Sequence, residues 1–205
     1  FLKLKNNGLA GTIDKRVPFH HEELDPSSID FSAFKTLCEK RHSVRWFKPQ
    51  PVPRHIIDQA IAVAVTAPSA CNRQPFQFFV FDDPEQASEI GSIPMGTAGF
   101  SDNFQCILVV VADLSAYPLE RDRHIIYIDS ALASMQLLLA FETQGLSSCV
   151  INWPDVERLE RQMSDRLSLE VHQRPVMLIA VGYADEKGLI PFSEKQSAKD
   201  SVRRS

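Results

Sequence analysis

The chain has 205 residues, 44% of them hydrophobic and 23% charged, which is ordinary for one soluble globular domain with a sizeable core. The formal net charge of −4 argues against a nucleic-acid-binding protein, which usually carries a basic face, but it leaves room for a local phosphate site. The start of the chain lacks a continuous apolar segment, and no run of about 18 apolar residues occurs anywhere. We therefore expect neither a signal peptide nor a membrane-spanning helix.

The four cysteines are widely spaced and form no CxxC pair and no metal-ligand pattern: Cys38, Cys71, Cys106 and Cys149. Dispersed cysteines in a chain of this length indicate reduced thiols, and hence the cytoplasm. No metal site is expected. Residue 1 is Phe rather than Met, so the sequence leaves open whether the chain is part of a longer protein.

Residues 1–29 lack clear periodicity, and we interpret them as an N-terminal arm or linker before a domain over 30–205. A first helix is predicted over 30–40, where apolar residues recur at helical spacing. A second helix is predicted from Pro53, a good first-turn residue, to about residue 66. The aromatic run at 76–81 predicts a strand.

In the second half, the β-branched run at 107–112 predicts a strand buried on both faces. The helix predicted over 128–143 is apolar on all sides, so it must be buried in a core or against another subunit. A short strand at 148–151, an amphipathic helix capped by Asp155 and a last strand at 176–181 follow, before a polar tail. This order predicts an α+β layered fold.

The first candidate site lies in the segment Arg41-His42-Ser43-Val44-Arg45. In an extended segment, Arg41, Ser43 and Arg45 would point the same way and could converge on one ligand. Guanidinium groups suit a phosphate or a delocalised anion, and serine adds a hydroxyl donor. The alternative is a solvated basic loop that caps helix ends.

The second candidate is the segment over 67–76, which links a buried helix to a buried strand and contains Pro68, Ser69, Asn72 and Gln74. The amide side chains can both donate and accept, which suits the edge of a heterocycle that offers N–H and C=O together. The alternative is an ordinary turn, because Pro, Ser and Asn are turn residues.

Two weaker candidates come later in the chain. A strand ends within Val150, Ile151, Asn152 and Trp153, and ligands of open α/β sheets bind at strand ends by analogy. Trp153 is either a wall of the substrate space or a partly buried core aromatic. Lys195 would ordinarily be a solvated lysine.

Taken in order, these segments resemble the nitroreductase family of flavoenzymes. RHSVRWF at 41–47 and APSACNRQPF at 67–76 are similar to the two opening motifs of the family, and the helix and strand at 129–151 resemble its core helix. VMLIAVGYADEKGLIPFSEK at 176–195 is similar to its final strand and phosphate-binding end. Two ordered motifs and the helix make this resemblance specific, over roughly residues 33–200.

The resemblance implies a three-layer α/β/α sandwich with a mixed, mainly antiparallel sheet, in a domain-swapped homodimer with FMN at the interface. It places Arg41 and Lys195 on the FMN phosphate, Ser43 at the phosphate or ribityl end, and Arg45 near N1 and O2 of the flavin. His42 lies within the same motif and is counted with the cofactor-binding residues. The backbone N–H of Asn152 would face N5, with Val150 to Trp153 running past the ring. The other subunit would supply the remaining contacts, with Asn72 at the ring edge: Pro68, Ser69, Asn72 and Gln74.

Some positions depart from the family pattern. Phe76 replaces a common Trp, Asn152-Trp153 replaces a small pair, and Lys195 replaces a common Arg, which loses a two-pronged phosphate contact. The region over 90–104 is short, so we expect the long lid helix of some members to be missing.

The resemblance implies an FMN-dependent oxidoreductase that uses NADH or NADPH to reduce nitroaromatics, quinones or similar small acceptors in a ping-pong cycle. The cofactor carries the chemistry, so no side-chain nucleophile is expected. One alternative keeps the flavin and changes the reaction to that of iodotyrosine deiodinases, dimethylbenzimidazole synthase or peptide azoline dehydrogenases. Another is a flavin-binding module without turnover. No nucleic-acid or membrane partner is expected.

Overall fold

The computed structural model describes residues 17–203, so residues 1–16 of the expected arm lie outside the described residues. The chain divides into two compact units, one ending at Lys35 and one beginning at Thr36. This boundary falls inside α1 (Phe31–Lys40). The described part of the first unit contains the short 3₁₀ helix η1 (His21–Glu23). The second unit contains the sheet and the candidate site.

The sheet has four strands in the order β1 (Phe76–Phe81), β2 (Cys106–Asp113), β4 (Gln173–Gly182) and β3 (Ser147–Asn152). Every neighbouring pair is antiparallel. Among the described residues, the parallel pairing that would make the sheet mixed is confined to one isolated bridge between Ser43 and Ser148. β1 and β3 are the two edge strands, a fact on which the geometry of the site depends.

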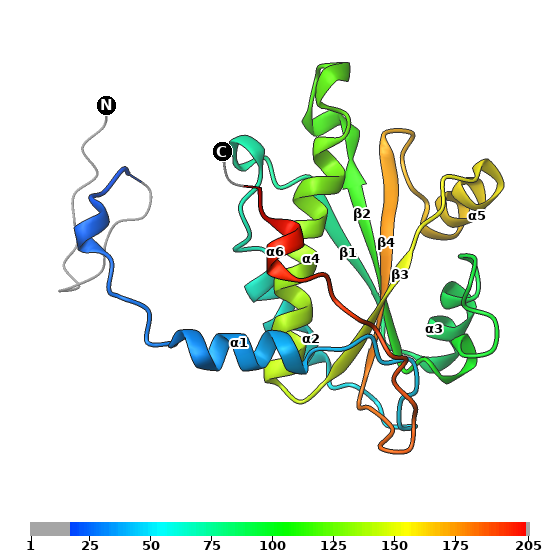
Figure 1. Ribbon diagram of the computed structural model, residues 1–205. Coiled ribbons are helices and arrows are strands. Elements are labelled where there is room, and N and C mark those ends of the chain that lie inside the picture. The colour runs from blue at the N-terminus through cyan, green and yellow to red at the C-terminus, as the bar shows by residue number, and fades with distance from the viewer. Residues whose placement is uncertain (1–16, 204–205) are drawn as a thin grey trace. The chain divides into compact units, whose positions relative to one another are not determined.

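The expected three layers are present: helices cover both faces of the sheet (Figure 1). α2 (Arg54–Ala64) and α4 (Ile125–Thr143) pack on one face, and α3 (Pro84–Gly91) and α5 (Glu157–Leu167) on the other. Strand side chains alternate between the layers because successive residues of a strand point to opposite faces. On β2, Leu108 and Val110 join the α2–α4 layer, whereas Val109 and Val111 join the α3–α5 layer.

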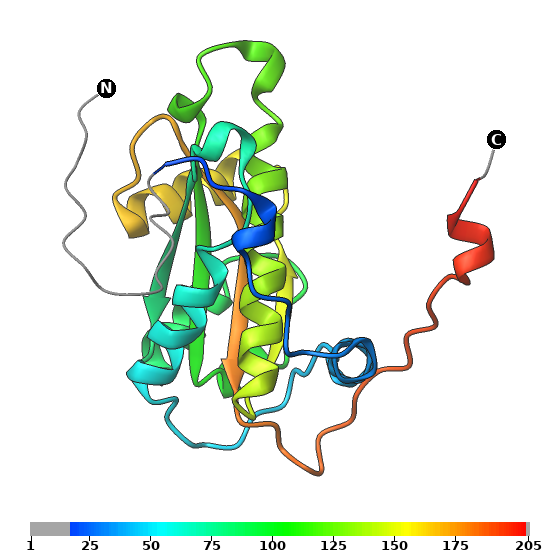
Figure 2. The ribbon, with the colours of Figure 1, turned by 90° about the vertical axis from the view of Figure 1, so that its left-hand side faces the viewer.

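α4 packs on the sheet beside α2 (Figure 2), and among the described residues its side chains are buried on the face toward the sheet. Leu137, Leu138 and Phe141 pack against the sheet, whereas the opposite face leaves apolar side chains exposed: Tyr127, Ile128, Leu132 and Met135. Gly145, with φ of 76°, ends the helix because a residue in this left-handed conformation turns the chain away. By length and composition α4 could cross a membrane, but half of that segment is buried within this fold, as in a core helix.

Several details differ from the sequence prediction. α4 and β4 each begin three residues before their predicted starts, at Ile125 and Gln173. Asp155 is not the N-cap of α5, because the backbone is still extended at Val156, which occupies the cap position without a side-chain bond. Pro53 likewise precedes the first turn of α2 rather than beginning it. α3 was not predicted, although Asp83 caps it by accepting from the backbone N–H of Gln86 at 3.1 Å, and Pro84 begins it.

Candidate functional site

The arginine segment runs as an extended chain along the outer side of β3. Ser43 bridges Ser148, and the N–H of Val44 donates to the Ser148 carbonyl oxygen at 3.0 Å. Val44 is buried, whereas Arg41, Ser43 and Arg45 are partly exposed. The extended geometry expected for this segment is therefore confirmed at Ser43 and Val44. The helix-capping alternative also describes part of the segment, because Nδ1 of His42 lies 2.8 Å from the carbonyl oxygen of Lys40, the last residue of α1.

Arg45 is fixed by the loop that follows α3. Its guanidinium carbon lies 5.7 Å from the centre of the Phe100 ring, a cation–π distance. The Asn103 side chain donates to the Arg45 carbonyl oxygen at 2.9 Å and accepts from the Phe47 N–H at 2.8 Å. One amide thus holds the backbone on both sides of Trp46, and it limits where the Arg45 side chain can reach.

The charges of Arg41 and Arg45 act at one place, the start of β3. Burial raises the pKa of the Cys149 thiol, and both guanidinium groups lower it in part. Burial also raises the pKa of Glu142, near the end of α4, against the opposing charges of Lys40, Arg41 and His42. Within residues 17–203, neither Arg41 nor Arg45 forms an ion pair with a carboxylate.

Beside these arginines, the hydroxyl oxygen of Ser148 is buried and has no hydrogen-bond partner among the described residues. Buried polar groups are normally paired, so this hydroxyl departs from the usual pattern. The two guanidinium groups of the arginine segment suit an anion such as a phosphate.

The backbone of β3 offers further donors along the sheet edge. The Ser148 carbonyl points outward to Val44, and backbone groups of a strand repeat their direction every second residue. The N–H and C=O of Val150 and Asn152 therefore point outward too. Both side chains are also exposed, whereas Ile151 is buried.

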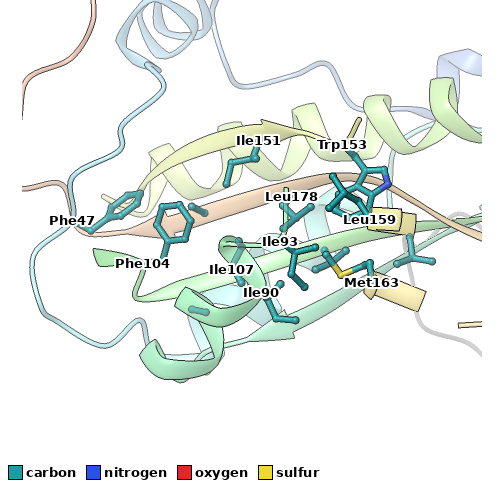
Figure 3. Close-up of a cluster of buried hydrophobic side chains, with 14 of the residues drawn as sticks. Phe47, Ile90, Ile93, Phe104, Ile107, Ile151, Trp153, Leu159, Met163 and Leu178 are labelled. Atoms are coloured by element: carbon teal, nitrogen blue, oxygen red, sulfur yellow. The ribbon is translucent and has the colours of Figure 1, made fainter. Parts of the chain in front are cut away.

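Trp153 belongs to the core rather than to an open wall. It packs with Leu159 and Met163 (Figure 3). It is 9% exposed, and its indole nitrogen donates to Glu160 at 2.5 Å. Its side chain matches the core-aromatic alternative. What this residue could offer a ligand is its backbone.

The amide segment has unusual backbone geometry. Cys71, Asn72 and Gln74 have φ angles of 53°, 53° and 48°, in the left-handed region that residues with side chains seldom adopt. The Gln74 amide nitrogen donates to the Asn72 side-chain oxygen at 2.8 Å, and the Gln74 N–H donates to the Ser69 hydroxyl at 3.0 Å. Asn72, Gln74 and the adjacent Pro68 are exposed. This is not an ordinary turn, because two paired amides are presented to the outside on a strained backbone.

The arginine and amide segments lie at diagonally opposite corners of the sheet. Ser148, beside the arginines, pairs with Val181 on β4, and Val181 pairs with Cys106 at the start of β2. Phe76, which ends the amide segment, pairs with Ala112 at the other end of β2 and on the other edge of the sheet. One copy of the chain therefore does not bring its own arginines and amides together.

α4 connects the two corners. Asp129, near its start, accepts from the N–H of Ala70 in the amide segment, and Glu142, near its end, feels the charge of Arg41. At a rise of about 1.5 Å per residue, these two acids are roughly 20 Å apart along the helix axis. The exposed apolar face of α4 lies between them.

Lys195 lies in the exposed tail after β4, where its amine donates to the Ser193 hydroxyl at 3.0 Å. In the part of the chain that the structure describes, no contact joins it to Arg41 or Arg45. No group of His, Cys, Asp or Glu residues within the described ranges could hold a metal ion, and the four cysteines are unpaired.

Four residues that shape the site were not identified from the sequence: Phe100, Asn103, Tyr117 and Asp129. Asp129 carried a signal, because it is the one charged residue in the apolar stretch 125–141 and a buried carboxylate needs partners. Phe100, Asn103 and Tyr117 carried none, since their contacts with Arg45 and Asp129 span from 12 to 58 positions of the chain.

Comparison with known proteins places this geometry in a family. The nitroreductase family model matches residues 38–99 and 93–183. A Streptococcus pyogenes serotype M6 protein, provisionally named an NAD(P)H nitroreductase, is 25% identical over 187 residues, covering 75% of this chain and 91% of that protein. Iodotyrosine deiodinase of Danio rerio is 42% identical over 60 residues, covering 29% of this chain and 20% of that protein.

Among solved structures, an FMN-dependent nitroreductase of Clostridium difficile R20291 has the same fold, with a TM-score of 0.69 and 21% identity over 82% of this chain and 96% of that one. The chain belongs to the nitroreductase family, whose members are oxidoreductases.

Proposed function

We propose that this protein is an FMN-dependent oxidoreductase that takes electrons from NADH or NADPH and passes them to a small acceptor, such as a nitroaromatic or a quinone, in a ping-pong cycle. The observation that carries the proposal is the pairing of two half-sites. Near one end of α4 lie two arginines that form no ion pair with a carboxylate among residues 17–203, and near the other end lie exposed amides on a strained loop.

The residues fit FMN in parts. Arg41 and Ser43 suit the phosphate end, and Arg45 suits the N1–O2 edge of the ring. The outward N–H of Asn152 suits N5, and the Asn72 and Gln74 amides suit the ring edge that offers N–H and C=O. We assign His42, Pro68, Ser69, Val150, Ile151 and Trp153 only to the surroundings of the cofactor.

A homodimer would complete the site. If two copies pair their exposed α4 faces around a two-fold axis with the helices antiparallel, the start of one α4 lies beside the end of the other. That arrangement places the amide segment of one copy against the arginine segment of its partner. It covers Ile128, Leu132 and Met135, which are otherwise exposed on a helix that is apolar all round.

The exposed tail fits the same assembly. Leu189, Ile190 and Phe192 leave much of their apolar surface in solvent, and the chain after β4 extends away from the sheet (Figure 2). A tail that crosses to the partner would bury these residues. It would also bring Lys195 to the phosphate end of the partner's site, whereas the resemblance in the sequence groups Lys195 with Arg41 and assigns only the amide segment to the other subunit.

When bound, FMN supplies hydride acceptance from the nicotinamide and hydride donation to the acceptor. Arg45 would then hold a fixed positive charge where reduction leaves negative charge, and the Asn152 N–H would orient the reacting edge. The chain supplies position and charge. Cys71 and His42 have no catalytic task, and four unpaired thiols suit a reducing compartment such as the cytoplasm.

A second candidate activity is reductive dehalogenation. It is favoured by one observation, the 42% identity to iodotyrosine deiodinase over 60 residues, and it uses the same cofactor site.

The test is an absorbance spectrum of the purified protein, titrated with FMN and then mixed with NADH or NADPH without oxygen. We expect a yellow protein that bleaches with one of the two donors and regains its colour with a nitroaromatic or a quinone. Iodotyrosine, offered separately, distinguishes the second candidate. A protein that takes up no FMN would refute both candidate activities. A bound flavin that neither NADH nor NADPH reduces would indicate a flavin-binding module without turnover.

A further inference from the structure

A buried carboxylate and a phenol lie behind the amide segment. Asp129 is 2% exposed, and its two oxygens lie 3.2 and 3.3 Å from the Ala70 nitrogen, whose N–H they accept. The Tyr117 hydroxyl contacts the same carboxylate, and its oxygen lies 3.2 Å from the Ala70 carbonyl oxygen. The single proton of that hydroxyl goes to one of the two acceptors at a time. Together, Asp129 and Tyr117 engage both backbone polar groups of Ala70.

The residues directly after Ala70 are the ones in left-handed backbone geometry. A single glycine can adopt this conformation alone, but Cys71, Asn72 and Gln74 adopt it only where the surroundings impose it. Arg73 adds a third anchor: its guanidinium lies over the Tyr117 ring at 5.4 Å and donates to the Ala116 carbonyl. The loop is therefore tied to Tyr117 on both sides of Asn72.

Burying the Asp129 carboxylate is energetically costly, which indicates that its contacts with Tyr117 and Ala70 have a role in holding the amide segment. A carboxylate in an apolar helix is destabilising unless it is hydrogen-bonded, and elsewhere on its covered face α4 uses Leu, Ala and Phe. Burial, and next to it the bond to Asp129, raises the pKa of Tyr117, so the phenol stays protonated and remains a donor. The partners of Asp129 that the structure shows belong to the amide segment and to Tyr117.

We infer that Asp129 and Tyr117 are positioning residues that hold residues 69–74 in the conformation that presents the Asn72 and Gln74 amides to the flavin of the partner copy. This inference rests on the proposed function. Because the loop is ordered before the cofactor arrives, less conformational entropy is lost on binding, and the affinity for FMN is correspondingly higher.

The test compares Asp129→Ala and Tyr117→Phe with Asp83→Ala, which removes a carboxylate that also accepts a backbone N–H but lies at the start of α3. Three quantities are measured in each variant: the thermal midpoint, the hydrogen–deuterium exchange of a peptide over 69–75, and the Kd for FMN. All three variants lose some stability. Only Asp129→Ala and Tyr117→Phe should speed exchange in the loop and raise the Kd by about tenfold or more.

Asp129→Asn provides a rescue, because its side-chain oxygen still accepts from Ala70, and we expect a Kd between those of wild type and Asp129→Ala. Should Asp129→Ala fail to fold, Tyr117→Phe decides, since it leaves the carboxylate in place. Suppose that the wild type binds FMN, and that Asp129→Ala and Tyr117→Phe have the same Kd and the same loop exchange as Asp83→Ala. This result would overturn the inference but not the proposed function. A wild type that takes up no FMN would overturn the proposed function and this inference with it.

Discussion

Arg45 is constrained by Phe100 at its side chain and by Asn103 at its backbone. Its charge should stabilise reduced flavin. A charge-assisted hydrogen bond contributes about 1.5–3 kcal/mol, which corresponds to roughly a 10- to 100-fold change in Kd. We expect Arg45→Gln to weaken FMN binding by that factor and to lower the reduction potential, as measured by fluorescence titration and by potentiometry.

Arg54→Gln is the matched control for Arg45→Gln, since it removes an arginine whose ion pair with Asp82 lies at the exposed start of α2. It should leave both the affinity and the potential unchanged. If the Arg45→Gln protein has the wild-type reduction potential, the Arg45 guanidinium does not lie at the ring edge of the flavin.

What sequence reasoning could predict of the site follows from the range of each interaction. The convergence of Arg41, Ser43 and Arg45 is a local consequence of extended geometry, and the structure confirms that geometry at Ser43. The link from Asp129 to Ala70 spans 59 positions, and no local pattern predicts which loop a lone helix carboxylate will reach. The sequence does not decide between the two alternatives for Trp153, because burial is a property of the whole core.

At the scale of elements, α3 gives a prediction in which packing outweighs helix propensity. Replacing glycine by alanine within a helix usually stabilises it by about 0.5–1 kcal/mol. At Gly91, however, a Cβ would lie 2.5 Å from Cδ2 of Phe104, which is fully buried. We expect Gly91→Ala to destabilise the fold by about 1–3 kcal/mol in chemical denaturation.

Ser88→Ala, on the same helix, is the control for Gly91→Ala and should be close to neutral. Phe104→Leu introduced beside Gly91→Ala should recover part of the loss by making room. Equal stability of Gly91→Ala and wild type would show that the ring moves aside freely.

The strands were easier to predict than the helix ends. β1 agrees with its aromatic run, and β2 and β3 extend the predicted strands by one residue at each end. Such runs are easy to recognise in the sequence, because both faces of the sheet are covered and most residues of its strands are therefore apolar. The predicted N-cap of α5 at Asp155 was wrong, because the backbone is still extended at Val156 and no local pattern in the sequence indicates this. The sequence analysis does not predict α3, although its Asp-Pro start is a recognised signal, because Ala87 and Ile90 are the two aliphatic residues among its eight.

At the scale of the whole molecule, the exposed face of α4 predicts how the proposed dimer can be disrupted. Leu132→Glu would place a charge in the middle of the proposed interface. We expect a monomer that retains its fold and loses FMN, as measured by light scattering and by flavin content. Val171→Glu is the control, because this apolar side chain is also exposed but lies before β4. If Leu132→Glu remains a dimer with full flavin content, the dimer interface does not include the exposed face of α4.

The alkaline stability of the fold depends on buried thiols. Burial raises the pKa of Cys106 to about 12, whereas an unfolded cysteine ionises near pH 8.5. Between about pH 9 and pH 12 the unfolded chain therefore releases a proton that the folded chain retains, so stability falls with rising pH, by about 1.4 kcal/mol per unit for one group. We expect Cys106→Ala to flatten the fall of the thermal midpoint over this window. Cys38→Ala, outside the sheet, should retain the wild-type slope, and equal slopes for the two would exclude Cys106 as the cause.

The diagonal placement of the arginines and the amides has a genetic consequence. A chain disabled at Arg45 still carries sound amides, and a chain disabled at Asn72 still carries a sound arginine segment. When the two defective chains are produced together, each mixed dimer would contain one intact site and one doubly damaged site. With random pairing, about a quarter of all sites in such a cell would be intact, although neither defective chain alone forms an intact site.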